Sequence, residues 1–262
     1  MLKYRIMTAA LLIPLVMAGV YFAPSKVFSI LAAGFFLIAA WEYVDVVGYP
    51  GLTIHLAYLL TVLLGMVLVK PYVYEILAIT VIFWLFAIAY LIFYSYQPLP
   101  LPRYWRALLG LGLLLPCWLS LVILQGSSNL LMYLFILVWG VDTAAYFIGK
   151  RFGKRRLAPL ISPGKTVVGA VGAICATLLL ASISSIWFAP QHYLAWLALS
   201  LGTTFFAIAG DLFESLLKRQ QGIKDSGHLL PGHGGLLDRI DSLMAAAPLF
   251  TLGIHCLDIA PR

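Results

Sequence analysis

Charged residues are scarce in this sequence: Asp, Glu, Lys and Arg occupy 10% of its 262 positions, whereas 63% are apolar. Soluble globular domains carry about 25% charged residues, and no stretch of this chain has the composition of a separate soluble domain. A helix that crosses a bilayer needs roughly 20 mostly apolar residues, and most segments between the charged clusters are about that long. The composition therefore predicts an integral membrane protein.

Cysteine is also rare, with three residues that are scattered through apolar stretches: Cys117, Cys175 and Cys256. None belongs to a Cys-x-x-Cys pair, so the sequence indicates neither a disulfide framework nor a zinc site. A basic start followed by an apolar run is compatible with a signal peptide, but no small-residue cleavage site follows it. We therefore expect the first apolar run to be retained as a membrane span.

Apolar runs between polar breaks predict an all-α membrane protein with about nine transmembrane helices. The predicted spans lie near residues 6–24, 27–47, 54–70, 72–95, 106–125, 129–149, 166–189, 191–217 and 240–259. We treat the chain as one membrane domain, with N-terminal helices in 1–125 and a C-terminal region in 126–262. The C-terminal region contains two long polar loops, 150–165 and 218–239.

The positions of Lys and Arg predict the orientation, because short loops rich in these residues stay in the cytoplasm. With the N-terminus inside, fourteen of the seventeen basic residues lie on the cytoplasmic side, and only Lys26, Lys70 and Arg262 lie outside. Both long loops are then cytoplasmic. The net charge of +7 is also consistent with simple attraction to anionic lipid headgroups.

The carboxylates gather near the C-terminal end of the chain, where six of the ten acidic residues follow position 200. Asp211, Glu214, Asp238 and Asp241 fall at or inside the ends of the last two predicted spans. Burial of a carboxylate at membrane depth costs about 2.5–3.5 kcal/mol on insertion scales, so such residues usually mark a functional cavity. We expect Asp211, Ser215 and Lys218 to share one face of the eighth span, and Asp238 and Asp241 to share a face of the ninth.

Three carboxylates beside a cavity that can admit phosphates are a donor set that suits Mg²⁺. The alternative is structural, with ion pairs between helices such as Asp238 with Lys218. A glycine-rich segment from Pro231 to Gly235 favours the functional interpretation, because glycine permits backbone N–H groups to approach an anion. By itself this segment also fits an ordinary turn.

The segment SLLKRQQGIKDSGHLLPGHGGLLDRID, from Ser215 to Asp241, resembles the defining pattern of the phosphatidate cytidylyltransferase (CDP-diacylglycerol synthase) family. Further similar segments are KYRIMTA at the start, AAWEY around Glu42, VDTAAYFIGKRFGK, LAPLISPGKT and GDLFES. The resemblance thus covers essentially the whole chain, and it is closer in the second half. Val168 departs from the family, which commonly has Glu or Gln there, so we expect no polar contact from this position.

The resemblance implies transfer of the cytidylyl group of CTP to phosphatidic acid, which gives CDP-diacylglycerol and pyrophosphate in the cytoplasmic membrane, with the active site facing the cytoplasm. It implies Mg²⁺ as the cofactor, held by Asp211, Asp238 and Asp241, with a second metal ion or a monovalent cation as open alternatives. The expected catalytic residues are these three carboxylates together with Lys218 and Lys224. The expected substrate-binding residues are Asp142, Ser162, Lys165, Thr166, Ser215, Arg219, His233, Gly234, Gly235 and Arg239.

Some of these residues fit a structural role equally well, and the sequence leaves two further functions open. Lys165 and Thr166 are equally consistent with snorkelling and helix capping. Gly164-Lys165-Thr166 ends like a phosphate-binding P-loop, but Pro159 occupies the position where that motif requires glycine. Another CTP-dependent lipid enzyme, such as a polyprenol kinase, and a membrane transporter remain as alternatives. Membrane lipid is an expected partner, nucleic acid is not, and Gly169 and Gly172 are compatible with a homodimer.

Overall fold

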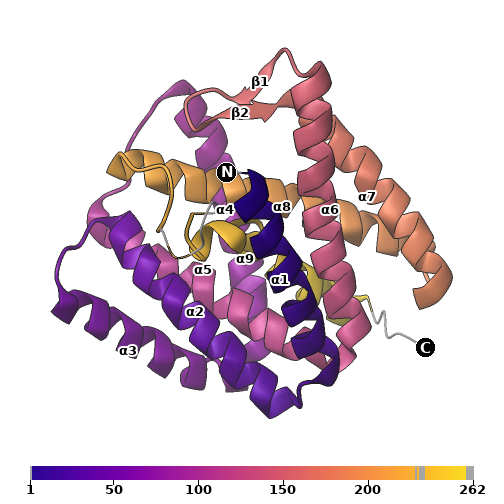
Figure 1. Ribbon diagram of the computed structural model, residues 1–262, viewed down its shortest axis with the longest axis horizontal. Helices are drawn as coiled ribbons and strands as arrows, with labels where there is room; N and C mark the ends of the chain where they lie inside the picture. Colours follow the sequence, from indigo (N-terminus) through magenta and orange to yellow (C-terminus); the bar gives the residue numbers. More distant parts are fainter. Residues whose placement is uncertain (1, 228, 230–233, 258–262) are drawn as a thin grey trace.

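The computed structural model describes residues 2–227, 229 and 234–257, and in this part of the chain helices dominate (Figure 1). Nine α-helices occur there: α1 (Leu2–Phe22), α2 (Ser25–Val47), α3 (Leu52–Leu68), α4 (Val73–Tyr96), α5 (Arg103–Leu124), α6 (Ser128–Phe152), α7 (Val167–Phe188), α8 (Tyr193–Gln221) and α9 (Asp241–Cys256). Short 3₁₀ turns precede three of them: η1 (Lys70–Tyr72), η2 (Gln125–Ser127) and η3 (Leu237–Arg239).

Each predicted span coincides with one of these helices to within a few residues, because long apolar runs without polar punctuation favour continuous helix. The number of helices does not by itself give the number of membrane crossings. Within the described residues, five helical segments are long and apolar enough to cross a bilayer, and one of them, Arg103–Phe152, contains both α5 and α6. Helices α3 and α9 have only 17 and 16 residues. The structure supports an integral membrane protein, and the count of nine spans is not confirmed.

The prediction of an all-α fold was incomplete, because the loop after α6 contains a small two-stranded sheet (Figure 1). Strands β1 (Arg156–Ala158) and β2 (Ser162–Thr166) pair in an antiparallel register that matches Arg156 with Thr166 and Ala158 with Ser162. Apolar runs do not predict this hairpin, because its strands are short and mostly polar. It holds the ends of α6 and α7 beside α8.

Close packing of α6 against α7 positions the hairpin. The Thr166 hydroxyl accepts a hydrogen bond from the Gly169 backbone N–H at 3.1 Å and so caps the N-terminus of α7. A methyl group added at Gly149 would lie 2.7 Å from this hydroxyl, and one added at Gly169 would lie 2.7 Å from the Ala145 carbonyl oxygen. Glycine is therefore required for the two helices to approach this closely. Capping by Thr166, one of the two roles considered from the sequence, is confirmed.

Helix α9 lies at the centre of the bundle, where it contacts α4, α5, α6 and α8. Its residues from Ser242 to Pro248 are all buried. A methyl group at Gly210 would lie 2.5 Å from the Asp241 carbonyl oxygen, so α8 and α9 meet at a point where only glycine fits. This contact brings Asp211, the next residue on α8, beside the first residue of α9.

Candidate active site

A cavity of about 700 Å³ lies between α6, the β-hairpin, the start of α7, the middle of α8 and the turn before α9. Its polar and charged lining residues are Asp142, Tyr146, Lys150, Arg156, Ser162, Lys165, Thr166, Asp211, Asp238, Arg239 and Asp241. They come from both long loops identified in the sequence and from the helices beside them. Four carboxylates and four basic side chains thus face one space.

The carboxylates of this cavity act on one another. Asp241 interacts electrostatically with Asp211, Asp142 and Glu214, and its Oδ1 accepts a hydrogen bond from the Ser242 backbone N–H at 2.8 Å. The Ser242 hydroxyl in turn donates to Asp142 Oδ2 at 3.3 Å. Several like charges around one cavity repel one another, so the arrangement favours the binding of a cation.

Lys165 provides one such cation from strand β2. Its Nζ lies 2.6 Å from Asp211 Oδ2, and both side chains are about three quarters buried. Asp211 also accepts a hydrogen bond from the Ser215 hydroxyl at 3.3 Å, one helical turn further along α8. The sequence predicted the Asp211–Ser215 spacing, whereas the pairing with Lys165 joins two segments 46 residues apart.

Lys218 lies behind the cavity, where it bridges two acidic side chains. Its Nζ forms an ion pair with Glu214, one turn earlier on α8, and lies 2.5 Å from Asp238 Oδ1. All three side chains are at least nine-tenths buried. The ion pair between Asp238 and Lys218, which the sequence left open as the structural alternative, is therefore present. Glu214 is one of the carboxylates expected at the span ends, but the sequence assigned it no role in the site.

Asp238 also accepts two hydrogen bonds from backbone N–H groups of the neighbouring loop. Its Oδ2 accepts from the backbone N–H groups of Ser226 at 3.0 Å and Gly235 at 2.9 Å. Burial alone would raise the pKa of Asp238, but the hydrogen bond and charge of Lys218, together with these N–H groups, outweigh it and lower the pKa. Asp238 is thus held as a carboxylate.

The prediction that Asp238 and Asp241 share a face of the last helix was wrong. Asp238 belongs to η3, and α9 begins only at Asp241, because Ile240 departs from helical geometry with φ −118° and ψ 2°. The turn directs Asp238 toward Lys218 and the backbone of Ser226 and Gly235. Asp241 is the first residue of α9, and its side chain accepts from the next backbone N–H, that of Ser242. Both residues nevertheless line the same cavity.

Glu42, on α2, is a part of this region that sequence reasoning did not include among the site residues. Its side chain is buried, and its Oε2 accepts hydrogen bonds from the Leu237 backbone N–H at 2.8 Å and the Ser226 hydroxyl at 3.2 Å. Gly227 and Gly235 both pack against this carboxylate. The signal was available, since a carboxylate inside an apolar run is itself unusual.

The structure gathers eight of the predicted site residues around the cavity: Asp142, Ser162, Lys165, Thr166, Asp211, Asp238, Arg239 and Asp241. Ser215, Lys218 and Gly235 contact cavity residues without lining the cavity themselves, and Gly234 packs against Asp238. Arg219 and Lys224 lie near the end of α8, and neither lines the cavity. His233 lies outside the described residues. The roles assigned to all of these residues stay predictions.

The donor set fits Mg²⁺ in its chemistry, because four carboxylates supply hard oxygen ligands beside an open cavity. In the present conformation, however, no three His, Cys, Asp or Glu side chains of the described residues converge closely enough to hold a metal ion. The nearest partner of Asp211 is the Lys165 ammonium group. Ligation by Asp211 would therefore require Lys165 to move away from it.

Comparisons with known proteins identify relatives of this chain that share one description. A protein of Pseudomonas aeruginosa described as a phosphatidate cytidylyltransferase is 39% identical over 260 residues, which cover 95% of this chain and 96% of the relative. Proteins of the same description from Haemophilus influenzae and Bacillus subtilis are 48% and 45% identical over 127 and 125 residues, which cover 47% of this chain in each case and 44% and 46% of the relatives. The sequence profile of the cytidylyltransferase family matches residues 3–257. This chain belongs to the cytidylyltransferase family.

Proposed function

We propose that this protein is a phosphatidate cytidylyltransferase, which transfers the cytidylyl group of CTP to the phosphate of phosphatidic acid. The family membership and the descriptions of its relatives support this activity. The structural observation that carries the proposal is the cavity of about 700 Å³, in which carboxylates from α6, α8 and η3 face basic side chains from α6, the hairpin and η3. A cavity of this size is within the range of small-molecule sites, about 300–1,000 Å³.

The reaction makes modest demands on proton transfer. A phosphate oxygen of phosphatidic acid is already anionic at neutral pH, and it forms a new bond to the α-phosphorus of CTP. The bond from this phosphorus to the oxygen that bridges it to the β-phosphorus breaks, and pyrophosphate leaves with that electron pair. Charge neutralisation and alignment of the two substrates therefore matter more than a strong general base.

The basic residues of the cavity can perform this neutralisation. Lys150, Arg156, Lys165 and Arg239 line it together. Arginine binds two phosphate oxygens at once through its planar guanidinium group, whereas lysine acts as a more localised charge. We assign these four side chains to the phosphates of CTP and of the lipid, while Lys218 holds Asp238 in place from behind.

Asp211 and Asp238 are the firmest candidates to hold Mg²⁺, with Asp241 and Asp142 beside them. When bound, Mg²⁺ supplies neutralisation of phosphate charge. Release of Lys165 from Asp211 would free the carboxylate for that role and free the ammonium group for a phosphate. Before the substrates bind, the positive charge of Lys165 thus neutralises the negative charge of Asp211.

We further propose that the cavity faces the cytoplasm, with the N-terminus on the same side. The division of fourteen basic residues against three supports this orientation. CTP arrives from water and phosphatidic acid from the bilayer. The lining of the cavity suits both substrates, because Ile208 and Tyr146 add apolar surface beside the charged groups.

The direct test is incubation of purified protein in detergent with Mg²⁺, phosphatidic acid and CTP labelled either at the α- or the γ-phosphate. We expect the α-label in the lipid product and the γ-label in pyrophosphate, only when phosphatidic acid and the divalent metal are both present. Transfer of the γ-label to lipid, with release of CDP, would instead identify a lipid kinase. Label transfer that ignores phosphatidic acid would contradict the proposal.

A further inference from the structure

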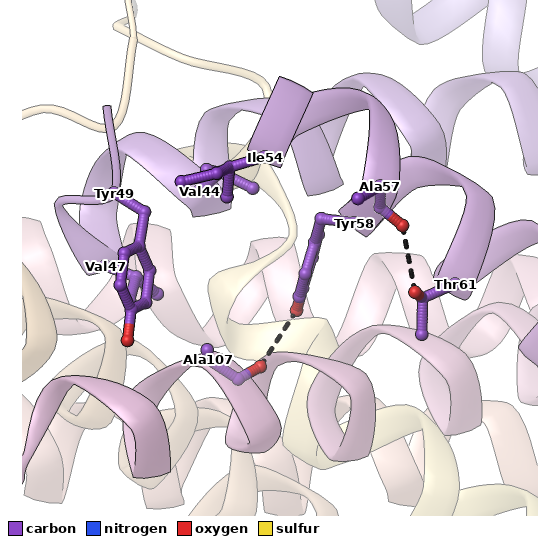
Figure 2. A pocket seen from close by; sticks show the side chains of 8 residues that line it. All are labelled: Val44, Val47, Tyr49, Ile54, Ala57, Tyr58, Thr61 and Ala107. Carbon is purple, nitrogen blue, oxygen red and sulfur yellow. Dashed lines mark hydrogen bonds between the residues drawn. The ribbon is translucent and has the colours of Figure 1, made fainter. Parts of the chain in front are cut away.

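A second hollow, an apolar groove of about 290 Å³, lies between helices α2, α3 and α5, and Figure 2 shows its lining. It shares no lining residue with the carboxylate cavity. Its lining residues are Val44, Val47, Tyr49, Ile54, Ala57, Tyr58, Thr61 and Ala107. The Tyr58 hydroxyl donates to the Ala107 carbonyl at 3.2 Å and the Thr61 hydroxyl to the Ala57 carbonyl at 2.9 Å, as the dashed lines in Figure 2 mark. These two hydroxyl groups are thus satisfied, and the groove offers apolar surface.

Two arginines in the first turn of α5, Arg103 and Arg106, lie next to residues of this groove without lining it themselves. The guanidinium group of Arg103 lies 5.4 Å from the centre of the Tyr49 ring, which is itself a groove residue. Arg106 immediately precedes Ala107 and interacts electrostatically with Arg103 and with Tyr49. Two positive charges therefore lie close together beside Tyr49 of the groove.

Arg106 lacks the partners that a buried guanidinium group normally has. The residue is 8% exposed, and its Nε and Nη1 atoms are buried without a hydrogen-bond acceptor. In the described part of the chain, the ion pairs formed with carboxylates involve neither Arg103 nor Arg106. The acidic residue near the end of α2, Asp45, is paired with His55 at 3.1 Å. An unpaired buried charge is costly, so an anion beside the guanidinium group of Arg106 would stabilise it, with the exposed Arg103 next to it.

We propose that this groove binds a resident anionic glycerophospholipid, with its phosphate at Arg103 and Arg106 and one acyl chain along the groove. The site lies where α2 ends at Val47 and α5 begins at Arg103, both within apolar segments of membrane-spanning length. Arginines at the ends of such helices stand at the depth of lipid headgroups. From Ile54 to Thr61, α3 rises about 10 Å, which accommodates the upper part of an acyl chain. This inference does not depend on the reaction at the carboxylate cavity.

The occupant is inferred to be a structural lipid rather than the substrate, because the two hollows have no residue in common. Native mass spectrometry of the purified protein can test this with phosphatidylglycerol and phosphatidylcholine of identical oleoyl chains. We expect the wild type to retain phosphatidylglycerol in preference to phosphatidylcholine. The double variant Arg103→Gln/Arg106→Gln should lose that retention by about tenfold or more, because both charged contacts to the phosphate are removed.

Two further variants make the test specific. Ala57→Phe fills the groove without a change of charge and should lower phosphatidylglycerol retention to a similar extent. The double variant Arg151→Gln/Arg155→Gln removes the same charge from exposed positions outside both hollows and should retain the lipid. Thermal unfolding of each variant in detergent reports whether the bundle is folded.

Three outcomes would overturn the proposal. Equal retention of the two lipids by the wild type would show that no anion is recognised. Unchanged retention by Arg103→Gln/Arg106→Gln would place the bound lipid elsewhere. A raised KM for phosphatidic acid in that variant, with phosphatidylglycerol retention unchanged, would make the groove an entrance for the substrate instead.

Discussion

The carboxylate of Glu42 accepts a hydrogen bond from the backbone N–H of Leu237 at 2.8 Å, across 195 positions of sequence. Leu237 is the residue before Asp238, and the same Glu42 oxygen binds the hydroxyl of Ser226, whose backbone N–H contacts Asp238. A single buried side chain of α2 thus holds both backbone segments that position Asp238. Glu42 is a positioning residue, since it does not line the cavity itself.

Glu42→Ala should therefore lower kcat at least about tenfold, because it leaves the buried Leu237 N–H without an acceptor, at a cost of about 1–3 kcal/mol. Glu42→Gln keeps an acceptor oxygen of similar shape and should recover most of the rate. Asp45→Asn, on the same helix but with an exposed side chain that pairs with His55, is the matched control. Equal loss in the Ala and Gln variants would show that the charge, rather than the hydrogen bonds, is needed.

Gly235→Ala should disrupt the same contact between Glu42 and the backbone segments that position Asp238. An added methyl group would collide with the Ser226 hydroxyl and the Glu42 carboxylate, which are both buried. We expect a lower thermal midpoint and a loss of activity of about tenfold or more. Gly112→Ala, where the added methyl group meets no atom within 4 Å, should keep both properties. A Gly235→Ala variant with unchanged activity and thermal midpoint would show that displacement of this segment affects neither property.

Asp211→Asn and Asp238→Asn should each reduce turnover roughly a thousandfold, since the loss of about 4 kcal/mol of transition-state stabilisation has that effect. Steady-state kinetics at saturating Mg²⁺, with thermal unfolding measured in parallel, separates catalysis from folding. Arg155→Gln serves as the control, because Arg155 is exposed and does not line the cavity. Near-normal rates in both Asp variants would assign the carboxylates a structural role.

Lys165→Met should raise the KM for CTP about tenfold or more, because one phosphate-binding charge leaves the cavity. It should also increase the affinity for Mg²⁺ in the absence of nucleotide, since Asp211 loses the ammonium group 2.6 Å away. Titration with Mn²⁺ as a substitute ion, followed by electron paramagnetic resonance, measures the metal affinity directly. Unchanged metal affinity would show that Lys165 does not compete for Asp211.

Single cysteines introduced into a variant without Cys117, Cys175 and Cys256 can report the orientation. A cysteine at position 155, in the basic loop, should react with an impermeant maleimide only after the cells are opened. A cysteine in place of Lys70, between α3 and α4, should react in intact cells. The reverse pattern would invert the proposed topology and place the cavity outside.

Local sequence signals were sufficient to predict the helices and the kind of chemistry. Each helix from α1 to α9 follows an apolar run bounded by charged residues, proline or glycine, and these boundaries act over a few neighbouring residues. The Ser215–Asp241 pattern is equally local, and it indicated the family that the profile match then showed. The ion pair of Lys218 with Asp238 was considered as one alternative because both residues belong to this segment.

The meeting of distant groups depends on the tertiary structure. Lys165 reaches Asp211 because glycine contacts bring α6 against α7 and a short hairpin then extends over α8. Glu42 reaches Leu237 because α2 packs beside the turn that precedes α9. Periodicity and composition describe which face of each segment is apolar. They carry no information about how two segments far apart in the sequence pack against each other, because that depends on side-chain shapes throughout the bundle.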